Sequence, residues 1–216
     1  MSLISKQDAL VRYLALINER PEEFDNSDAE YKIITSPEQI KKFEESTGLT
    51  IGVVYESQYN IMLVDLVSDG ENLFSYERII PAVKNSAVVA LTICCGKFIM
   101  LRQYRHALRD WQYAFPRGFG EHNLTAYENM LKELSEELGC DTISALYLGN
   151  IAPDSGLTGN IAKVYLCNIN NYQQRRHYEG IKQVDEFTPD DLKQLIRNGK
   201  INDGFSLAAL SLYRAI

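Results

Sequence analysis

One segment constrains the fold of this chain more than any other. Residues 115–140, FPRGFGEHNLTAYENMLKELSEELGC, run from a Pro- and Gly-rich loop directly into a helix-forming stretch. Thr125, followed three residues later by Glu128, predicts a capping box at the start of the helix, and Gly139 predicts its end. Leucines recur at helical spacing and predict the face that packs on a core: Leu131, Leu134 and Leu138. The opposite face is left for solvent or a ligand.

The same helix concentrates acid. With Glu133 as reference, Glu137 lies about 40° away around the helix axis and Glu136 about 60° away on the other side. Carboxylates this close repel one another by roughly a few tenths of a kcal/mol per pair unless a cation lies among them. Carboxylate oxygens suit Mg²⁺ or Mn²⁺. A solvated acidic face is the alternative, but a preceding Gly-rich backbone that can approach a metal or phosphate closely favours a ligand site.

The segment resembles the signature of the Nudix hydrolases, G-x5-E-x7-R-E-U-x-E-E-x-G-U, in which U is a bulky apolar residue. With Gly118 on the first glycine, the matching positions are Glu133, Leu134, Glu136, Glu137 and Gly139, and Cys140 takes the last apolar position. The resemblance implies an α/β fold, namely a Nudix-type α/β/α sandwich with a mixed β-sheet, plus an N-terminal helical and β extension. The order of elements predicted from the sequence agrees with that fold.

The resemblance also implies a role for each matching residue. Glu133 and Glu137 are the expected main metal ligands, and Glu136 is a further ligand or holds a metal-bound water. The carbonyl group of Arg117 is expected to complete the Mg²⁺ or Mn²⁺ site, while the backbone of Gly118 approaches the substrate. Such a centre suits hydrolysis of a phosphoanhydride, because the metal neutralises developing charge and lowers the pKa of the attacking water.

Two positions depart from the signature. Leu124 stands at the first Glu and Lys132 at the Arg. In the family these positions mainly brace the loop against the helix, and the loss of both leaves no buried charge alone. Glu128, four residues before Lys132, is expected to form a helix ion pair with it. Asn123 stands where many members have Gly, and Asn tolerates a positive φ. A working variant of the signature is therefore expected.

The resemblance extends to the ADP-ribose pyrophosphatase branch of the family. In LRQYRHALRDWQYAFPRG, residues 101–118, Arg105 follows Gln-Tyr and is the expected contact to the substrate diphosphate or terminal phosphate, with Arg102 as a second candidate. A late loop of the branch often supplies a catalytic glutamate. Glu179 in YEGI is the candidate here, as general base or metal ligand. Two weaker candidates lie nearby: Asp185 and Glu186.

Composition and charge exclude several classes of function. The chain has 216 residues and a formal net charge of -7. An acidic chain is a poor ligand for nucleic-acid backbone or anionic membrane, so neither partner is expected. No apolar run reaches the roughly 20 residues of a membrane span. The four cysteines form no C-x-x-C pair, which favours free thiols and a cytoplasmic location. The adjacent Cys94 and Cys95 are expected to point to opposite faces of a strand.

Three regions are predicted along the chain. Residues 1–45 are expected to form an N-terminal helical extension, with Ser36 capping one helix. Residues 46–85 are expected to form an N-terminal β-region that contributes to a homodimer and to the substrate pocket, and residues 86–216 form the Nudix hydrolase domain. The first 50 residues hold six Lys and Arg against ten Asp and Glu, which argues against DNA binding by these helices.

The leading functional prediction is divalent-metal-dependent hydrolysis of a nucleoside diphosphate linked to another moiety. ADP-ribose, giving AMP and ribose 5-phosphate, is the first choice, and other nucleotide sugars, dinucleotides and diadenosine polyphosphates stay open. The alternative is a nucleotide-sensing Nudix-like binding module with weak or no catalysis, which the changes at Leu124 and Lys132 motivate. A structural role has only the unassigned N-terminal helices in its favour.

Overall fold

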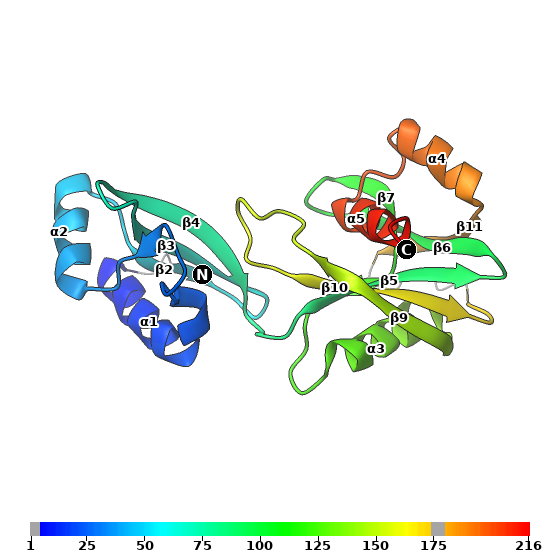
Figure 1. The fold of residues 1–216 in the computed structure, drawn as a ribbon, viewed down its shortest axis with the longest axis horizontal. Coiled ribbons are helices and arrows are strands. Elements are labelled where there is room, and N and C mark those ends of the chain that lie inside the picture. The colour runs from blue at the N-terminus through cyan, green and yellow to red at the C-terminus, as the bar shows by residue number, and fades with distance from the viewer. Residues whose placement is uncertain (1–4, 174–179) are drawn as a thin grey trace. The chain divides into compact units, whose positions relative to one another are not determined.

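A computed structural model describes residues 5–173 and 180–216 and divides the chain into two compact units. The first unit comprises Met1–Val83 with Asp154–Gly159, and the second comprises Lys84–Pro153 with Asn160–Ile216. Figure 1 shows the elements of each unit. No helix in the described ranges is long and apolar enough to cross a membrane.

The first unit packs two helices and a short 3-10 helix against an antiparallel sheet (Figure 1). Its elements are α1 (Lys6–Glu19), the 3-10 helix (Pro21–Phe24), β1 (Lys32–Ile33), α2 (Pro37–Thr47), β2 (Gly52–Glu56), β3 (Asn60–Ser68) and β4 (Leu73–Pro81). Strand β3 lies at the centre and pairs with the other three. The side chains of Tyr13 and Leu16 from α1 share a core with Ile61 and Leu63 from β3. Ser36 caps α2, as predicted, by accepting the amide of Gln39.

The second unit is built on a mixed sheet with the strand order β11-β6-β5-β10-β9. Its strands are β5 (Ala87–Cys94), β6 (Lys97–Arg105), β7 (Asp110–Ala114), β8 (Arg117–Gly118), β9 (Thr142–Ile151), β10 (Ala162–Ile169) and β11 (Ile181–Phe187). Its helices are α3 (Ala126–Leu138), α4 (Pro189–Arg197) and α5 (Gly204–Tyr213). Strands β5 and β10 run parallel, whereas β5 and β6 form an antiparallel hairpin.

The alternation of side chains along β5 places helices on both faces of this sheet. Val88 and Ala90 share a core with the apolar face of α3. Val89 and Leu91, on the other face, pack in a core that includes α4 and α5. The predicted α/β/α sandwich is therefore confirmed. The apolar stripe of α3 is shifted slightly from the prediction, because Met130 is fully buried with Leu134 and Leu138 while Leu131 is partly buried.

The prediction for the adjacent cysteines is only half right. Cys94 is buried and Cys95 is exposed, and both are free thiols. Their sulfur atoms nevertheless lie 4.0 Å apart. Strand β5 ends at Cys94, and Cys95 has a φ of 49° in the hairpin turn, so the side-chain alternation of an extended strand no longer applies there.

Candidate functional site

Helix α3 carries a buried polar stripe beside its apolar one. Asn129, Glu133 and Glu137 recur every four residues and are 1%, 9% and 2% exposed. The helix begins and ends as predicted. Thr125 and Glu128 form a capping box, and Gly139 ends the helix with a φ of 59°. Two of the three predicted metal-binding carboxylates are thus turned toward the protein rather than toward bulk solvent.

These two carboxylates lie against the short strand β8. The backbone N–H of Arg117 donates a hydrogen bond to Glu137 Oε2 at 3.2 Å. A Cβ atom on Gly118 would come within 1.8 Å of Glu133 Oε1, so a residue larger than glycine would displace the carboxylate. Strand β8 is held in place by pairing with Val88 and Val89 of β5. The glycine of the predicted signature is therefore required by a close approach of backbone to carboxylate.

The third carboxylate is more exposed and is bound to a lysine. Glu136 Oε2 accepts a hydrogen bond from Lys132 Nζ at 2.9 Å. In the described parts of the chain, no three His, Cys, Asp or Glu side chains are grouped closely enough to form a metal site on their own. Mg²⁺ usually takes only one or two protein carboxylates, with waters and substrate oxygens completing its shell. Glu133 and Glu137 beside the Gly118 backbone fit such a donor set.

Lys132 still braces the loop against the helix, although by a different partner from the expected one. Its Nζ atom donates to Glu121 Oε1 at 2.7 Å as well as to Glu136. The predicted pair with Glu128 is wrong, because the Glu128 carboxylate instead accepts hydrogen bonds from Thr125. Asn123 has a φ of 65°, as the sequence predicted. The loop therefore keeps its support without an acid at position 124.

Arg105, at the end of β6, brings a partly buried positive charge to this region. Its Nε and Nη2 atoms are buried and have no hydrogen-bond partner. Burial, helped by the neighbouring charge of Arg117, lowers the pKa of the Arg105 guanidinium to about 10, while the charges of Asp203 and Glu137 oppose the shift. Buried donors without partners are costly, and an anionic ligand would supply acceptors for them.

Arg117 is held by the first turn of α5. Its Nη2 atom lies 3.3 Å from Asp203 Oδ1, and its guanidinium lies over the Phe205 ring at 4.2 Å. Ser206 of the same helix turn also binds this segment, because its hydroxyl oxygen accepts a hydrogen bond from the backbone N–H of Phe115 at 3.0 Å. The end of the chain therefore fixes the segment that leads into the predicted signature.

The remaining predicted residues lie elsewhere or outside the described ranges. Arg102 lies over the Tyr113 ring at 5.9 Å. Glu179 lies outside the described residues. Glu186 is bound to Lys97 at 2.7 Å and to Tyr172 at 2.9 Å. The structure thus brings Glu133, Glu137, Gly118, Arg117 and Arg105 together and places Arg102 and Glu186 in other contacts.

Several residues of this region escaped the sequence analysis. Asn129 donates a hydrogen bond from Nδ2 to the Phe119 carbonyl oxygen at 2.7 Å. This bond sets the orientation of the Asn129 side-chain amide, whose buried Oδ1 atom has no hydrogen-bond partner. A signal for it exists, because a polar residue four positions before Glu133 continues the polar stripe of the helix. Asp203 also left a signal: Asp followed three residues later by Ser precedes an apolar run and predicts a helix cap.

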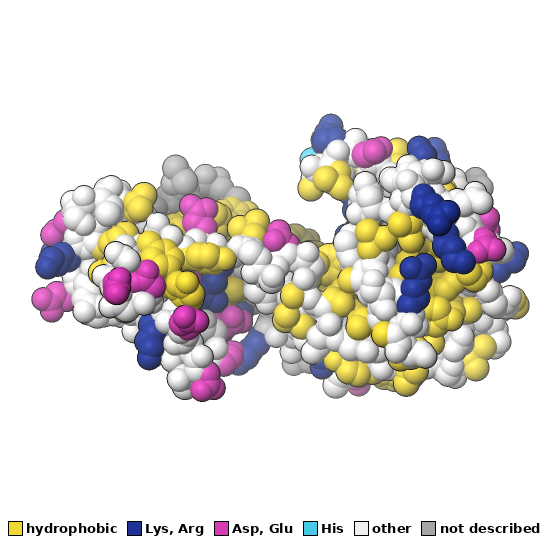
Figure 2. Space-filling view, turned by 45° about the horizontal axis from the view of Figure 1, so that its top comes forward, with side chains coloured by type: hydrophobic (Ala, Val, Ile, Leu, Met, Phe, Trp, Pro, Cys, Tyr) yellow, Lys and Arg dark blue, Asp and Glu magenta, His cyan; other side chains and the backbone are white. Residues whose placement is uncertain are grey.

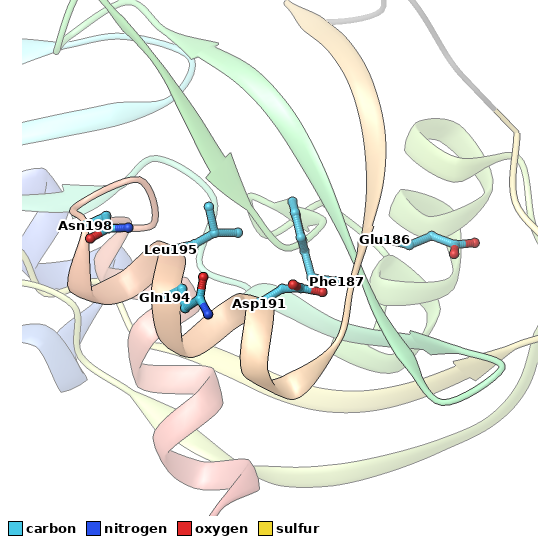
Figure 3. A pocket seen from close by; sticks show the side chains of 6 residues that line it. All are labelled: Glu186, Phe187, Asp191, Gln194, Leu195 and Asn198. Carbon is cyan, nitrogen blue, oxygen red and sulfur yellow. The ribbon is translucent and has the colours of Figure 1, made fainter.

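A surface pocket of the second unit lies beside α4 (Figure 3). Its lining residues are Glu186, Phe187, Asp191, Gln194, Leu195 and Asn198. Both of its acids have structural partners, since Asp191 accepts hydrogen bonds from Thr188 and Glu186 is bound to Lys97. Because its lining is acidic and holds no Lys or Arg, the pocket is poorly suited to a phosphate. Lys and Arg side chains of the second unit can be seen on the face that Figure 2 shows.

Comparison with known proteins agrees with the fold. No family model and no curated protein matches the chain. A crystal structure described as an ADP compounds hydrolase aligns with a TM-score of 0.65 and 17% sequence identity, over 77% of this chain and 91% of that one. At such low identity the likeness shows the fold alone. The chain has a Nudix-like α/β fold.

Proposed function

We propose that this chain hydrolyses a nucleoside diphosphate linked to a second group and that it uses a divalent cation held by Glu133 and Glu137. One observation carries the proposal: the buried carboxylates of Glu133 and Glu137 lie against the Arg117–Gly118 backbone. The guanidinium of Arg105, which has two nitrogens without hydrogen-bond partners, lies close enough to interact electrostatically with Glu137. The carboxylates attract a cation and Arg105 attracts an anion. A metal-bound phosphoanhydride supplies both.

The residues divide the chemistry among them. Mg²⁺ or Mn²⁺, held by Glu133, Glu137 and the carbonyl group of Arg117, would neutralise phosphate charge and lower the pKa of the attacking water. Arg105 would donate hydrogen bonds to a phosphate oxygen, where a buried charge-assisted bond is strong. Gly118 leaves room for the Glu133 carboxylate, and its backbone would approach the substrate. Glu179 remains the candidate for the general base.

ADP-ribose is the proposed substrate within this class. The motif resembles that of ADP-ribose pyrophosphatases, and the solved structure that shares the fold is described as a hydrolase of ADP compounds. A hydrolase for such compounds needs a cationic contact to the diphosphate, which Arg105 offers.

A nucleotide-sensing module is the second candidate, and one observation favours it. The Nζ atom of Lys132 forms an ion pair with Glu136 Oε2 at 2.9 Å, and it therefore competes with a metal ion for that carboxylate. A site with two carboxylates could bind a metal–nucleotide complex and turn it over slowly. Activity measurements separate the two functions.

The decisive experiment compares Glu137→Gln with wild type on a panel of nucleoside diphosphate derivatives in Mg²⁺ or Mn²⁺. Loss of a metal ligand removes several kcal/mol of transition-state stabilisation, so we expect the rate to fall about a thousandfold. Glu45→Gln, a change at an exposed acid of α2, is the matched control and should keep full activity. Tight binding without turnover across the whole panel would instead favour the sensing module.

A further inference from the structure

Two adjacent thiols meet at the turn between β5 and β6. Their Sγ atoms lie 4.0 Å apart, and Cys94 Sγ also lies 3.4 Å from the Asn170 carbonyl oxygen. Cys94 is 6% exposed, whereas Cys95 is open to solvent. The pair therefore presents one thiol at the surface and holds a second thiol directly behind it.

The turn is an uncommon place for a cysteine. Cys94 pairs with Lys97, so Cys95 and Gly96 form a two-residue hairpin loop, and both have a positive φ, of 49° and 77°. Such a loop favours Asn, Asp or Gly at its first position, because most other residues are strained there. A Cβ atom on Gly96 would meet no atom within 4 Å beyond its chain neighbours, so the turn has room to change conformation.

We propose that Cys94 and Cys95 form a redox-active dithiol that low-molecular-weight disulfides close into a reversible disulfide. The Cys95 thiolate attacks one sulfur of the small disulfide, RSSR, and releases RS⁻, which leaves a mixed disulfide on Cys95. The Cys94 thiol then loses its proton, and its sulfur attacks the Cys95 sulfur and releases the second RS⁻. The two protein thiols are thereby oxidised by two electrons, and RSSR, with the two protons, becomes two RSH.

The surroundings of the two thiols set the order of these steps and the stability of the product. Burial, and then the neighbouring Cys95, raise the pKa of the Cys94 thiol, so the exposed Cys95 reacts first. The Cα atoms of adjacent residues are about 3.8 Å apart, closer than the roughly 4.4–6.8 Å of ordinary disulfides. The closed pair is therefore strained, and thiols reduce it readily.

The dithiol lies at the other end of β5 from the proposed catalytic centre. Strand β8 pairs with Val88 and Val89 near the start of β5, whereas Cys94 ends that strand. The six residues from Val88 to Cys94 span about 20 Å of extended strand. The thiol chemistry is therefore independent of the proposed hydrolysis, and each is measured without the other.

The test exposes the reduced, full-length protein to oxidised glutathione and identifies the product by intact-protein and peptide mass spectrometry. The wild type should lose the mass of two hydrogen atoms, with the new disulfide mapped to Cys94 and Cys95, and dithiothreitol should restore both thiols. Cys94→Ser should instead retain one glutathione on Cys95, because no second thiol displaces it. Cys95→Ser should slow oxidation at Cys94 by at least about tenfold, since the remaining thiol is buried.

The two other cysteines of the second unit are internal controls. Cys140 and Cys167 are buried free thiols and should stay reduced while the pair is oxidised. Cys140→Ala is the matched control variant, because Cys140 shares the hydrophobic core of Cys94, and it should give the wild-type product. A lasting mixed disulfide in the wild type, a disulfide of Cys94 with Cys140 or between two protein molecules, or oxidation of Cys140 and Cys167 as fast as Cys95 would overturn the inference.

Discussion

Each unit of this protein holds a partly buried arginine, and the two arginines have opposite surroundings. In the first unit, Arg78 donates from Nε to the buried Asp65, which also accepts the hydroxyl of Tyr13. Its Nη2 donates to the Glu23 carbonyl at 3.0 Å, and the guanidinium lies over Phe24 at 5.1 Å. In the second unit, Arg105 buries Nε and Nη2 without partners.

The difference separates a structural network from a binding site. A buried polar network stabilises a fold when its members are satisfied, whereas each unsatisfied buried donor costs about 1–3 kcal/mol. The first unit closes its network with side chains from α1, β3 and β4. The second unit leaves donors open beside two carboxylates. Such a cost is expected where a ligand supplies the missing partner, so the open network marks function and the closed one marks structure.

The same substitution in both units tests this comparison, and the larger effect on stability is expected in the first. Arg78→Met leaves the Asp65 carboxylate buried without its cation, which should lower the free energy of unfolding of that unit by about 3–5 kcal/mol. Urea denaturation followed by hydrogen exchange of β3 measures the change. Adding Asp65→Asn to Arg78→Met should recover part of the loss. A loss below about 1 kcal/mol would contradict a closed network.

Arg105→Met should act in the opposite direction on stability. It removes unpartnered donors and the repulsion from Arg117, so the free energy of unfolding should stay unchanged or rise by about 1–3 kcal/mol. Substrate binding should suffer, because a lost charge-assisted hydrogen bond of about 1.5–3 kcal/mol corresponds to roughly a 10–100-fold increase in KM. Melting curves and steady-state kinetics check both. Destabilisation with an unchanged KM would make Arg105 structural, like Arg78.

The two units should also respond differently to alkaline pH. Burial raises the pKa of the Cys167 thiol to about 12, whereas an unfolded thiol titrates near about 8.5. Between these values the folded second unit keeps a proton that the unfolded chain has lost. The stability from Cys167 is therefore complete below about pH 8.5 and falls toward pH 12, by about 1.4 kcal/mol per pH unit. The first unit contains no cysteine.

This pH dependence is measurable with the natural probe of the second unit. Trp111 is the single tryptophan of the chain and lies in that unit, so its fluorescence reports urea unfolding there. In reducing buffer between pH 8 and 10.5, Cys167→Ala should flatten the fall of stability with pH. Equal slopes for the variant and wild type would exclude the thiol as the cause. Hydrogen exchange of β3 should show no comparable fall below about pH 10.

The sequence predicted best what neighbours in the chain decide. The capping box of Thr125 and Glu128, the stop at Gly139 and the positive φ of Asn123 all depend on a few adjacent residues. The predicted pair of Glu128 with Lys132 was wrong because two local interactions competed for one carboxylate, and the cap prevailed. Helical spacing alone does not rank such competitors.

Long-range contacts were beyond the reach of the sequence. The pair of Arg117 with Asp203 joins residues far apart in the chain, and it forms only because the fold brings β8 next to the start of α5. The burial of Glu133 and Glu137 likewise depends on where β8 lies, not on the helix itself. The motif identified the acids, but the sheet decides which of them form a pair.

The smallest effect is expected at the positions where the sequence departs from the Nudix signature. Lys132 and both of its acidic partners are more than a third exposed, so Lys132→Met should cost less than about 1 kcal/mol of stability. Restoring the signature with Leu124→Glu and Lys132→Arg should leave turnover within a few-fold of wild type. The loop already has other support, because Asn85 donates to the Leu124 carbonyl at 3.1 Å and Asn129 holds Phe119. A rise in turnover above about tenfold would show that the brace limits catalysis and that Lys132 withholds Glu136 from the metal.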